Sequence, residues 1–445
     1  MFKKIIKKFI PSFLLLGYHR CLSNLGKIIY GNPSQKMITI GVTGTTGKSS
    51  VVYLISHLFD LLGFTTGASS TITFKIADQE WLNNKKMTMP GRFSLPRLLR
   101  KMVQANCQYA IVETSSEGIR QYRHLGINYD LAVFTNLSPE HLERHHGWKN
   151  YRIAKGKLFK ELIKGKRKNI IGRQIDKINI VNLDDPEANY FSSFSADKHF
   201  GYSLGNNIVN INSNLKKIKL ENLRLTAKDS SFTIAGQYFQ SNLLGSFNVS
   251  NCLAVITVAI SQGIPLEKIA AALIKIKTIP GRLEFVNQDQ NFSVIVDYAH
   301  TPYAFKAIYQ AIKQIPLLKT GGKIIHVLGG CGGGRDIKKR PILGKIAGQE
   351  ADAVIITNED PYDENPEQII NQVAEGSLEA GKRINQNLFK ILNRRQAIKK
   401  ALDLANQNDL VLITGKGSEQ TMCVVGGKTI PWDDREIVRE LLKAR

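Results

Sequence analysis

Short apolar runs alternate with amphipathic segments along the chain from residue 37 onward. Residues 37–43 lead into a glycine-rich turn, and residues 49–62 then show apolar positions three and four apart, which is typical of a helix. Apolar runs at residues 109–113 and 131–136 have the length and composition of buried strands. This alternation predicts an α/β fold with a mainly parallel sheet that is covered on both faces.

The alternation resumes after an irregular middle region. Between residues 177 and 240, short strands separated by Asn, Ser and Gly predict an antiparallel element, and helices are expected at 248–262 and 265–277. Pro280-Gly281 is typical of a domain boundary. Further strands are expected at residues 292–297, 323–328, 353–357 and 410–414. We therefore expect a short cationic amphipathic segment (1–36), a central domain (37–279) and a C-terminal domain (280–445).

The first twenty residues place lysines ahead of a short apolar run, MFKKIIKKFIPSFLLLGYHR. A signal peptide requires a cleavage site of small residues after the apolar run, and none follows here. The run is also shorter than the ~20 residues of a membrane-spanning helix. Phe2, Ile5, Ile6, Phe9 and Ile10 recur at helical spacing with lysines between them. This pattern suits a helix lying on an anionic membrane surface, and it equally suits a helix docked on the protein's own body.

Composition places the chain among ordinary globular proteins, except for its charge. Of 445 residues, 43% are hydrophobic and 22% charged, and the formal net charge is +24. A basic balance suits nucleic acid, nucleotide-linked substrates or an acidic membrane. No recognition helix or aromatic RNA-binding motif accompanies the charge, so we expect no nucleic-acid partner. The five cysteines are far apart without zinc-ligand spacing, which favours reduced thiols in a cytoplasmic enzyme.

Residues 41–49, GVTGTTGKS, lie between a predicted strand and a predicted helix. Glycines allow backbone N–H groups to approach phosphate oxygens, and the helix start adds its positive dipole end. Lys48 is expected to offset the charge of the terminal phosphates, and the Ser49 hydroxyl to bind magnesium. Val42 stands where the strict Walker pattern has glycine. The segment nevertheless predicts a phosphate-binding loop.

The segment Gly44–Ser49 resembles the nucleotide loop of the Mur ligase superfamily, which also includes folylpolyglutamate synthases. Seven further stretches follow in the family's order, and they are similar to those of the ligases that add the third residue to a UDP-N-acetylmuramoyl dipeptide. They are ETSSEGI (113–119), TNLSPEHL (135–142), YRIAK (151–155), GSFNVSN (245–251), GRLE (281–284), DYAHTP (297–302) and GGGRDIKKRP (332–341).

The resemblance implies a central P-loop ATPase domain and a C-terminal Rossmann-like α/β domain. It implies an ADP-forming ligase that uses ATP and Mg²⁺ to join an amino acid to a muramoyl-peptide acceptor through an acyl-phosphate, in peptidoglycan synthesis. The catalytic residues would be Lys48, Glu113, His141 and Lys155. Magnesium would be held by Ser49, Glu113 and His141, with Lys155 if that lysine is carbamylated.

The remaining site residues also follow from the resemblance. ATP would be bound by Gly44, Thr45, Thr46, Gly47, Lys48, Ser49 and Ser50, with Asn248 at the adenine, Arg282 at the phosphates or ribose, and Asp297 at the ribose. The acceptor would be bound by Thr88, Ser115, Gln121 and Arg123, and the incoming amino acid by Asp360, Arg394, Gly415 and Glu419. Taken without the resemblance, Lys155 is also explained as a solvated lysine, His141 as a structural histidine and Asp297 as a strand-end cap.

Two features depart from the family pattern. Only residues 1–36 precede the strand of the loop, where the family has a domain of about 100 residues that grips the uridine nucleotide. We therefore expect an acceptor bound without its nucleotide, or one that is lipid-linked and presented at the membrane. The diaminopimelate enzymes carry Asp-Asn-Pro-Arg, whose arginine clamps a carboxylate. Residues 359–362 read EDPY, with Asp363 and Glu364 next, which favours lysine or ornithine over diaminopimelate.

Two other classes of function remain as alternatives. One is a different ligase of the same superfamily, of the folylpolyglutamate or polymer amino-acid type. The other is a nucleotide-dependent nucleic-acid or membrane adaptor. The expected location is the cytoplasm, with peripheral contact at the inner face of the membrane through residues 1–20 as a further hypothesis.

Overall fold

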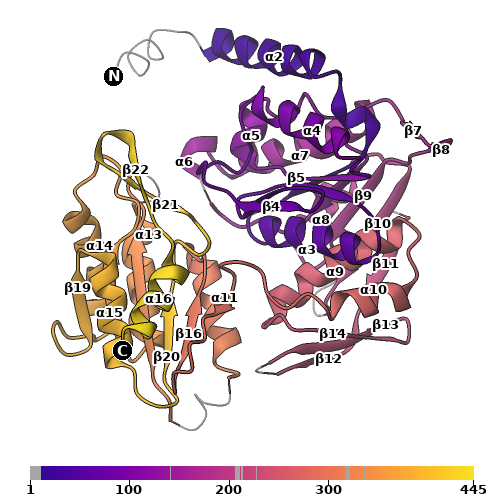
Figure 1. The fold of residues 1–445 in the computed structure, drawn as a ribbon. Coiled ribbons are helices and arrows are strands. Elements are labelled where there is room, and N and C mark those ends of the chain that lie inside the picture. Colours follow the sequence, from indigo (N-terminus) through magenta and orange to yellow (C-terminus); the bar gives the residue numbers. More distant parts are fainter. Residues whose placement is uncertain are drawn as a thin grey trace. The chain divides into compact units, whose positions relative to one another are not determined.

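The computed structural model describes residues 12–140, 142–205, 211, 214–226, 228–315, 321–334 and 337–445 (Figure 1). The chain divides into two compact units. The first contains the residues up to Glu221 with Thr233–Phe239 and Ser250–Ile276, and the second contains Asn222–Phe232, Gln240–Val249 and Lys277–Arg445. Each unit is described by itself.

A nine-stranded, mostly parallel sheet forms the centre of the first unit, in the order β11-β10-β9-β6-β1-β5-β2-β3-β4. Its central strand β1 pairs in parallel with β5 on one side and β6 on the other. Only β3 and β4 run antiparallel to their neighbours. The strands are β1 (Ile38–Thr43), β2 (Thr66–Ser69), β3 (Thr73–Ile76), β4 (Gln79–Leu82), β5 (Tyr109–Glu113), β6 (Leu131–Phe134), β9 (Ile178–Asn182), β10 (Lys198–Ser203) and β11 (Lys216–Lys219).

Helices cover both faces of this sheet, as the sequence predicted. The core on one face joins apolar side chains of α4, α5, α7 and α8 to the strands, and α3 packs against β1, β2 and β5. The helices are α2 (Ser12–Ile29), η1 (Pro33–Lys36), α3 (Lys48–Leu61), α4 (Ser94–Gln104), α5 (Ser116–Arg120), α6 (Leu142–His145), α7 (Trp148–Lys164), α8 (Ala188–Ser192), α9 (Ser246–Ser261) and α10 (Leu266–Leu273).

The antiparallel element predicted for residues 177–240 is wrong for its first half. There β9, β10 and β11 pair in parallel and extend the main sheet. The short polar strands suggested an antiparallel element because β11 is the edge strand of the sheet and mostly exposed, whereas the last four residues of β10, its inner neighbour, are buried. A separate three-stranded sheet follows, with β12 (Glu221–Leu225), β13 (Ser230–Ile234) and β14 (Gln237–Ser241); β7 (Asn169–Ile170) and β8 (Arg173–Gln174) form a short hairpin.

The second unit contains a six-stranded sheet in the order β15-β16-β20-β17-β18-β19, and only β15 is antiparallel. One core lies under α11, α13 and α14, and another under α15 and α16. The predicted fold class, two α/β units with parallel sheets, is confirmed. The strands are β15 (Glu284–Phe285), β16 (Ser293–Val296), β17 (Ile324–Gly330), β18 (Ala353–Asn358), β19 (Leu388–Ile391) and β20 (Leu410–Ile413), with a hairpin of β21 (Thr421–Val424) and β22 (Lys428–Pro431). The helices are α11 (Pro302–Ile312), α13 (Lys339–Glu350), α14 (Pro366–Glu379), α15 (Arg394–Leu404), η2 (Val425–Gly427) and α16 (Asp434–Lys443).

The N-terminal helix α2 packs beside α4 in the first unit (Figure 1). Residues 1–11, which carry most of the predicted membrane-binding pattern, lie outside the described residues. No helix in the described part of the chain combines the length and apolarity that crossing a bilayer requires.

Candidate active site

The phosphate loop runs from the end of β1 to the start of α3. Gly47 precedes α3 with a φ of 79°, and a Cβ there would lie 2.5 Å from Oδ1 of Asn251. A Cβ at Gly44 would lie 1.9 Å from Oγ1 of Thr135. Both positions therefore require glycine. Without side chains at these two positions, backbone N–H groups at the positive end of α3 are accessible, and such groups bind phosphate oxygens.

Asn136, just beyond β6, fixes the shape of this loop. Its carbonyl oxygen accepts a hydrogen bond from N of Thr45 at 2.8 Å, and its Oδ1 accepts one from N of Thr46 at 2.9 Å. Lys48 donates from Nζ to the carbonyl oxygen of Thr45 at 2.6 Å, so its ammonium lies at the loop. The first N–H groups of α3 have no acceptors within the helix, because of helix geometry. Together with Lys48 they provide the positive field that a triphosphate needs.

Ser49 and Glu113 bring two oxygen ligands together beside the loop. Ser49 donates from Oγ to Oε2 of Glu113 at 2.8 Å, and N of Thr71 donates to the same oxygen at 2.7 Å. Glu113 is 1% exposed and ends β5, opposite Val42 of β1 in the parallel register. A buried carboxylate and a hydroxyl are the ligands that magnesium prefers, so these residues fit that ion.

His141, the third predicted magnesium ligand, lies outside the described residues. In the rest of the chain, as far as the structure describes it, no three His, Cys, Asp or Glu side chains gather as a metal site. The hydroxyl–carboxylate pair is therefore the part of the predicted magnesium site that the structure places.

Lys155 reaches the same loop from α7. It is 1% exposed, donates from Nζ to the carbonyl oxygen of Gly44, and lies 4.5 Å from the ring centroid of Tyr151. Burial, with a further contribution from the nearby charge of Lys48, lowers the pKa of Lys155 well below its ordinary value. Lys155 is therefore a buried amine rather than a solvated lysine, and its lowered pKa shifts the equilibrium toward the neutral form.

A hydrogen-bonded chain connects the loop to the first predicted acceptor residue. The hydroxyl oxygens of Thr88 and Thr71 lie 2.9 Å apart, and N of Thr71 in turn donates to Glu113. Since Glu113 also accepts from Ser49, hydrogen bonds link the phosphate loop to Thr88 through Glu113 and Thr71. Thr71 had no predicted role.

The other three predicted acceptor residues gather at α5. Ser115 is the N-cap of that helix. Gln121 donates from Nε2 to Glu117 and accepts from Nη2 of Arg123, both at 2.7 Å. Arg123 also donates to the carbonyl oxygen of Met89, next to Thr88 in the chain. Gln121 and Arg123 are thus joined by hydrogen bonds, and Ser115 caps the helix that precedes them.

The remaining predicted ATP residues belong to the second unit. Asp297 is buried at the end of β16, and its carboxylate accepts hydrogen bonds from two backbone N–H groups at 2.7 and 2.6 Å. Burial raises the pKa of Asp297. Arg282 stacks on the ring of Tyr298 at 4.4 Å, and Asn248 is buried at the start of α9.

The predicted amino-acid residues lie at the carboxyl edge of the second sheet. Arg394 is fully enclosed: its Nε and Nη2 donate to the Asp434 carboxylate at 2.8 and 2.7 Å, and Nη2 also donates to the carbonyl oxygen of Thr414 at 2.8 Å. The next residue, Gly415, has a φ of 106°, and a Cβ there would lie 2.4 Å from Oε2 of Glu359. Gly415 thus makes room for a buried carboxyl group whose pKa is raised by burial.

Lys416 organises the two other members of this group. Its buried Nζ donates to both carboxylate oxygens of Asp360 at 3.0 and 3.1 Å, to Oε2 of Glu419 at 2.6 Å, and to the carbonyl oxygen of Thr421 at 2.8 Å. One ammonium therefore holds two carboxylates that were predicted to contact the incoming amino acid. The sequence singled out both carboxylates and missed the lysine.

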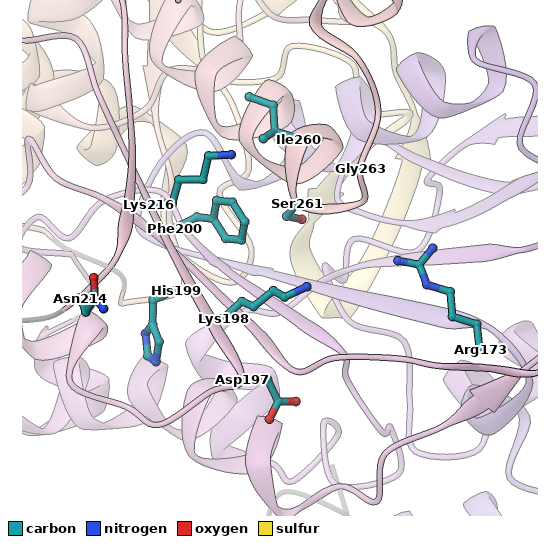
Figure 2. Close-up of a pocket in the computed structure, with 10 residues that line it drawn as sticks. All are labelled: Arg173, Asp197, Lys198, His199, Phe200, Asn214, Lys216, Ile260, Ser261 and Gly263. Atoms are coloured by element: carbon teal, nitrogen blue, oxygen red, sulfur yellow. The ribbon is translucent and has the colours of Figure 1, made fainter.

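A separate cavity of about 520 Å³ lies at the β10–β11 edge of the first unit (Figure 2). Its lining includes the basic side chains Arg173, Lys198, His199 and Lys216. None of the residues predicted for the ligase site lines it. This cavity is therefore distinct from the phosphate site.

Two family models match the chain. The Mur ligase middle domain matches residues 42–259, and the Mur ligase glutamate ligase domain matches residues 281–417. Among similar proteins is the UDP-N-acetylmuramoyl-L-alanyl-D-glutamate–2,6-diaminopimelate ligase of Geobacillus kaustophilus (strain HTA426), 34% identical over 98% of this chain and 85% of the relative. Another is the UDP-N-acetylmuramyl-tripeptide synthetase of Roseiflexus sp. (strain RS-1), 35% identical over 97% and 84%.

A solved structure of a UDP-N-acetylmuramoyl-L-alanyl-D-glutamate–2,6-diaminopimelate ligase is also similar. It has a TM-score of 0.60 and 28% identity, and the match covers 95% of this chain and 82% of that one. The fold and the phosphate site define a nucleotide-dependent enzyme with two α/β domains. The chain belongs to the Mur ligase family, and it is an ATP-dependent, ADP-forming ligase that makes an amide bond. The family, the ligase activity and the use of ATP are thus confirmed.

Proposed function

We propose that this ligase adds an amino acid to the free carboxylate of a muramoyl-dipeptide acceptor during peptidoglycan synthesis. The names of the relatives support this acceptor class. The main structural support is the chain of hydrogen bonds from Ser49 through Glu113 and Thr71 to Thr88, because it joins the phosphate loop to one of the residues predicted to bind the acceptor.

ATP, when bound, supplies the γ-phosphoryl group that converts the acceptor carboxylate into an acyl-phosphate. The backbone of residues 44–50 and the Lys48 ammonium would hold the phosphates and offset the charge that develops there. Ser49 and Glu113, with His141, would hold Mg²⁺. Thr88, Ser115, Gln121 and Arg123 would orient the acceptor. Asn248, Arg282 and Asp297 would bind the adenine, phosphate or ribose groups.

We assign Lys155 the role of a carbamylated residue. Carbamylation adds CO₂ to a neutral amine and releases a proton, so the lowered pKa of Lys155 favours it. The product is an anion at the loop, next to Gly44 and within the field of Lys48. This carbamate would complete the magnesium site together with Glu113.

For the amino-acid substrate we propose lysine or ornithine rather than diaminopimelate. Tyr362 stands where the arginine clamp of the diaminopimelate enzymes is expected. Glu359 lies against Gly415, and the next residue, Lys416, is the buried cation bound between the carboxylates of Asp360 and Glu419. Such an acidic surrounding favours a side chain that ends in an ammonium group.

Arg394 was expected to bind the incoming amino acid. Its guanidinium is bound to Asp434 and to the carbonyl oxygen of Thr414. We therefore propose that Arg394 acts mainly by holding the segment that carries Gly415 and Lys416.

A substrate matrix tests the proposal. UDP-N-acetylmuramoyl-L-alanyl-D-glutamate and its nucleotide-free form are each combined with lysine, ornithine and diaminopimelate, and amide product is scored with ADP release. We expect product with lysine or ornithine. Amide formation on a folate, or on a polymer other than peptidoglycan, with none on either muramoyl dipeptide, would instead identify another ligase of the family.

We place the enzyme in the cytoplasm, where ATP and the nucleotide-linked precursors are available. Contact of the N-terminal segment with the inner face of the membrane is part of the same proposal. Its basis in the sequence is the combination of lysines and apolar residues in residues 1–20.

A further inference from the structure

Helix α2 presents a line of apolar side chains to solvent. Leu14, Tyr18, Cys21, Leu25 and Ile28 are spaced alternately four and three residues apart, so they lie on one face of the helix. Leu14, Tyr18, Leu25 and Ile28 are 54%, 58%, 48% and 67% exposed, and Cys21 is also exposed. We call these five residues the outer stripe. A continuous exposed apolar face of this kind is typical of a binding surface.

The opposite side of α2 explains how the helix is held, and it does not use the outer stripe. Ser23 is 2% exposed and donates from Oγ to the carbonyl oxygen of Tyr122 at 2.7 Å. Gly26 packs so closely that a Cβ there would lie 2.6 Å from the carbonyl oxygen of Arg92. Two small residues of α2 thus make close contacts with the rest of the unit, while the outer stripe remains exposed.

All charged residues of α2 and of the segment before it are basic. Asp60 is the first acidic residue of the chain. Before it, the N-terminal segment and α2 carry Lys3, Lys4, Lys7, Lys8, Arg20 and Lys27. An apolar face on a helix whose own charged side chains, Arg20 and Lys27, are both basic complements a surface that combines hydrocarbon with negative charge, and an anionic bilayer is such a surface.

A second copy of the chain fits this surface less well. Pairing two outer stripes would bring two sets of like charges together, with no acidic side chain from either α2 to offset them. Tyr18 adds a residue type that is enriched where protein meets the headgroup region of a bilayer. Charge and residue type thus both favour lipid.

We propose that α2 binds the surface of an anionic membrane, with the outer stripe inserted among the lipid headgroups. This inference names the partner of the proposed contact at the inner face of the membrane, and it rests on the proposed function for its biological purpose. The ligase site begins beyond α2, at Gly44, so the binding surface and the catalytic residues are separable by mutation.

Co-sedimentation of the full chain with vesicles tests the proposal. Vesicles of phosphatidylcholine alone are compared with an equal mixture of phosphatidylcholine and phosphatidylglycerol. The stripe variant carries Leu25→Gln and Ile28→Gln. The matched control carries Ile163→Gln and Ile171→Gln, which remove two isoleucines that are 50% and 96% exposed elsewhere in the same unit. Thermal melting verifies that both variants fold.

We expect the wild type and the control to bind the mixed vesicles and to bind phosphatidylcholine weakly. The stripe variant should bind the mixed vesicles roughly tenfold more weakly or worse, because each aliphatic group buried in lipid contributes to binding. Added salt should weaken wild-type binding, since exposed charges are screened over about 8–10 Å at physiological ionic strength.

Equal binding by the stripe variant and the wild type overturns the proposal, as does failure of the wild type to bind the mixed vesicles. A dimer in analytical ultracentrifugation that the stripe variant loses, without lipid binding, assigns the surface to a second copy instead. Amide synthesis on soluble acceptor is measured for the same proteins. Vesicle binding is measured without any reaction taking place. A failure of the proposed ligase function would therefore be seen only in the amide-synthesis assay, and a failure of the membrane proposal only in the co-sedimentation assay.

Discussion

Lys155 donates a hydrogen bond from Nζ to the carbonyl oxygen of Gly44, 111 residues away in the sequence. Helix α7 thereby delivers a buried amine to the inner side of the phosphate loop. The same amine lies above the ring of Tyr151, whose hydroxyl is 3.1 Å from Oγ1 of Thr45. The loop is therefore shaped by α7 as well as by its own glycines.

The first prediction concerns the chemical state of Lys155. Lys155→Ala should reduce amide synthesis by about a hundredfold or more, because the proposed carbamate ligand is lost. Short carboxylates such as formate should restore part of the activity by occupying the vacated space. Since the pKa of Lys155 is lowered, the amine is neutral at lower pH than an exposed lysine, and carbamylation should persist there.

Intact mass and bicarbonate dependence check this prediction. Wild-type activity should fall after decarbonation and return with bicarbonate. Full activity of a decarbonated enzyme whose Lys155 is unmodified would reject the carbamate.

The second prediction concerns Lys48. Lys48→Ala should lower the rate of amide synthesis by at least about a hundredfold, because removing a preorganised charge from a phosphoryl-transfer site has effects of this size. Lys160→Ala is the matched control, since Lys160 is an exposed lysine of α7. Phosphate release and the thermal transition are measured for both. A folded Lys48 variant with near wild-type turnover would show that the loop does not serve catalysis.

Local patterns along the chain predicted most of the helices and strands and the phosphate loop. The side chains that support the site come from distant segments, and the sequence did not identify them. The loop was identifiable because strand, glycines and helix are consecutive. Asn136 was missed because it reaches the loop only through the pairing of β6 with β1, and Thr71 because it reaches Glu113 only through the pairing of β2 with β5. Likewise, Asp434 lies 40 residues from Arg394 and pairs with its guanidinium, which the sequence had predicted to bind the substrate.

The third prediction concerns Lys416 as a positioning residue. Lys416→Met should raise KM for the amino acid by roughly tenfold or more, because removing a buried charge from its partners typically costs 2–5 kcal/mol. KM for the acceptor should change little, since the hydrogen-bond partners of Lys416, Asp360, Glu419 and Thr421, belong to the second unit. Lys428→Met, at an exposed lysine of β22, is the control. A fall in kcat with unchanged KM for the amino acid would contradict this role.

The fourth prediction concerns the missing arginine clamp. Tyr362→Arg should raise the use of diaminopimelate relative to lysine, because a guanidinium binds a carboxylate through two parallel hydrogen bonds. The ratio of kcat/KM values for the two amino acids measures the change. Tyr303→Arg adds the same charge at an exposed tyrosine of α11 and should leave the ratio unchanged. An unaltered ratio in both variants would place the specificity elsewhere.

The last prediction concerns a buried ion cluster in the first unit. Asp130 accepts hydrogen bonds from Lys168 and, at 3.0 Å, from Lys177, and its carboxylate also binds N of Thr39 at 2.8 Å. Asp130→Asn would leave two buried ammonium groups facing each other. The variant should therefore lose about 3–5 kcal/mol of the free energy of unfolding. Lys168→Met should be tolerated better, because Asp130 keeps its bond to Lys177.

The pH dependence of the same cluster has a defined sign. Burial lowers the pKa of Lys168 to about 8, from an ordinary value of 10.5. Between these values the folded protein releases a proton that the unfolded chain keeps, so stability from this group rises with pH. Thermal unfolding of wild type and Lys168→Met is compared from pH 7 to above pH 9. The wild type should gain stability relative to the variant as pH rises, and a constant difference across this window would contradict the lowered pKa.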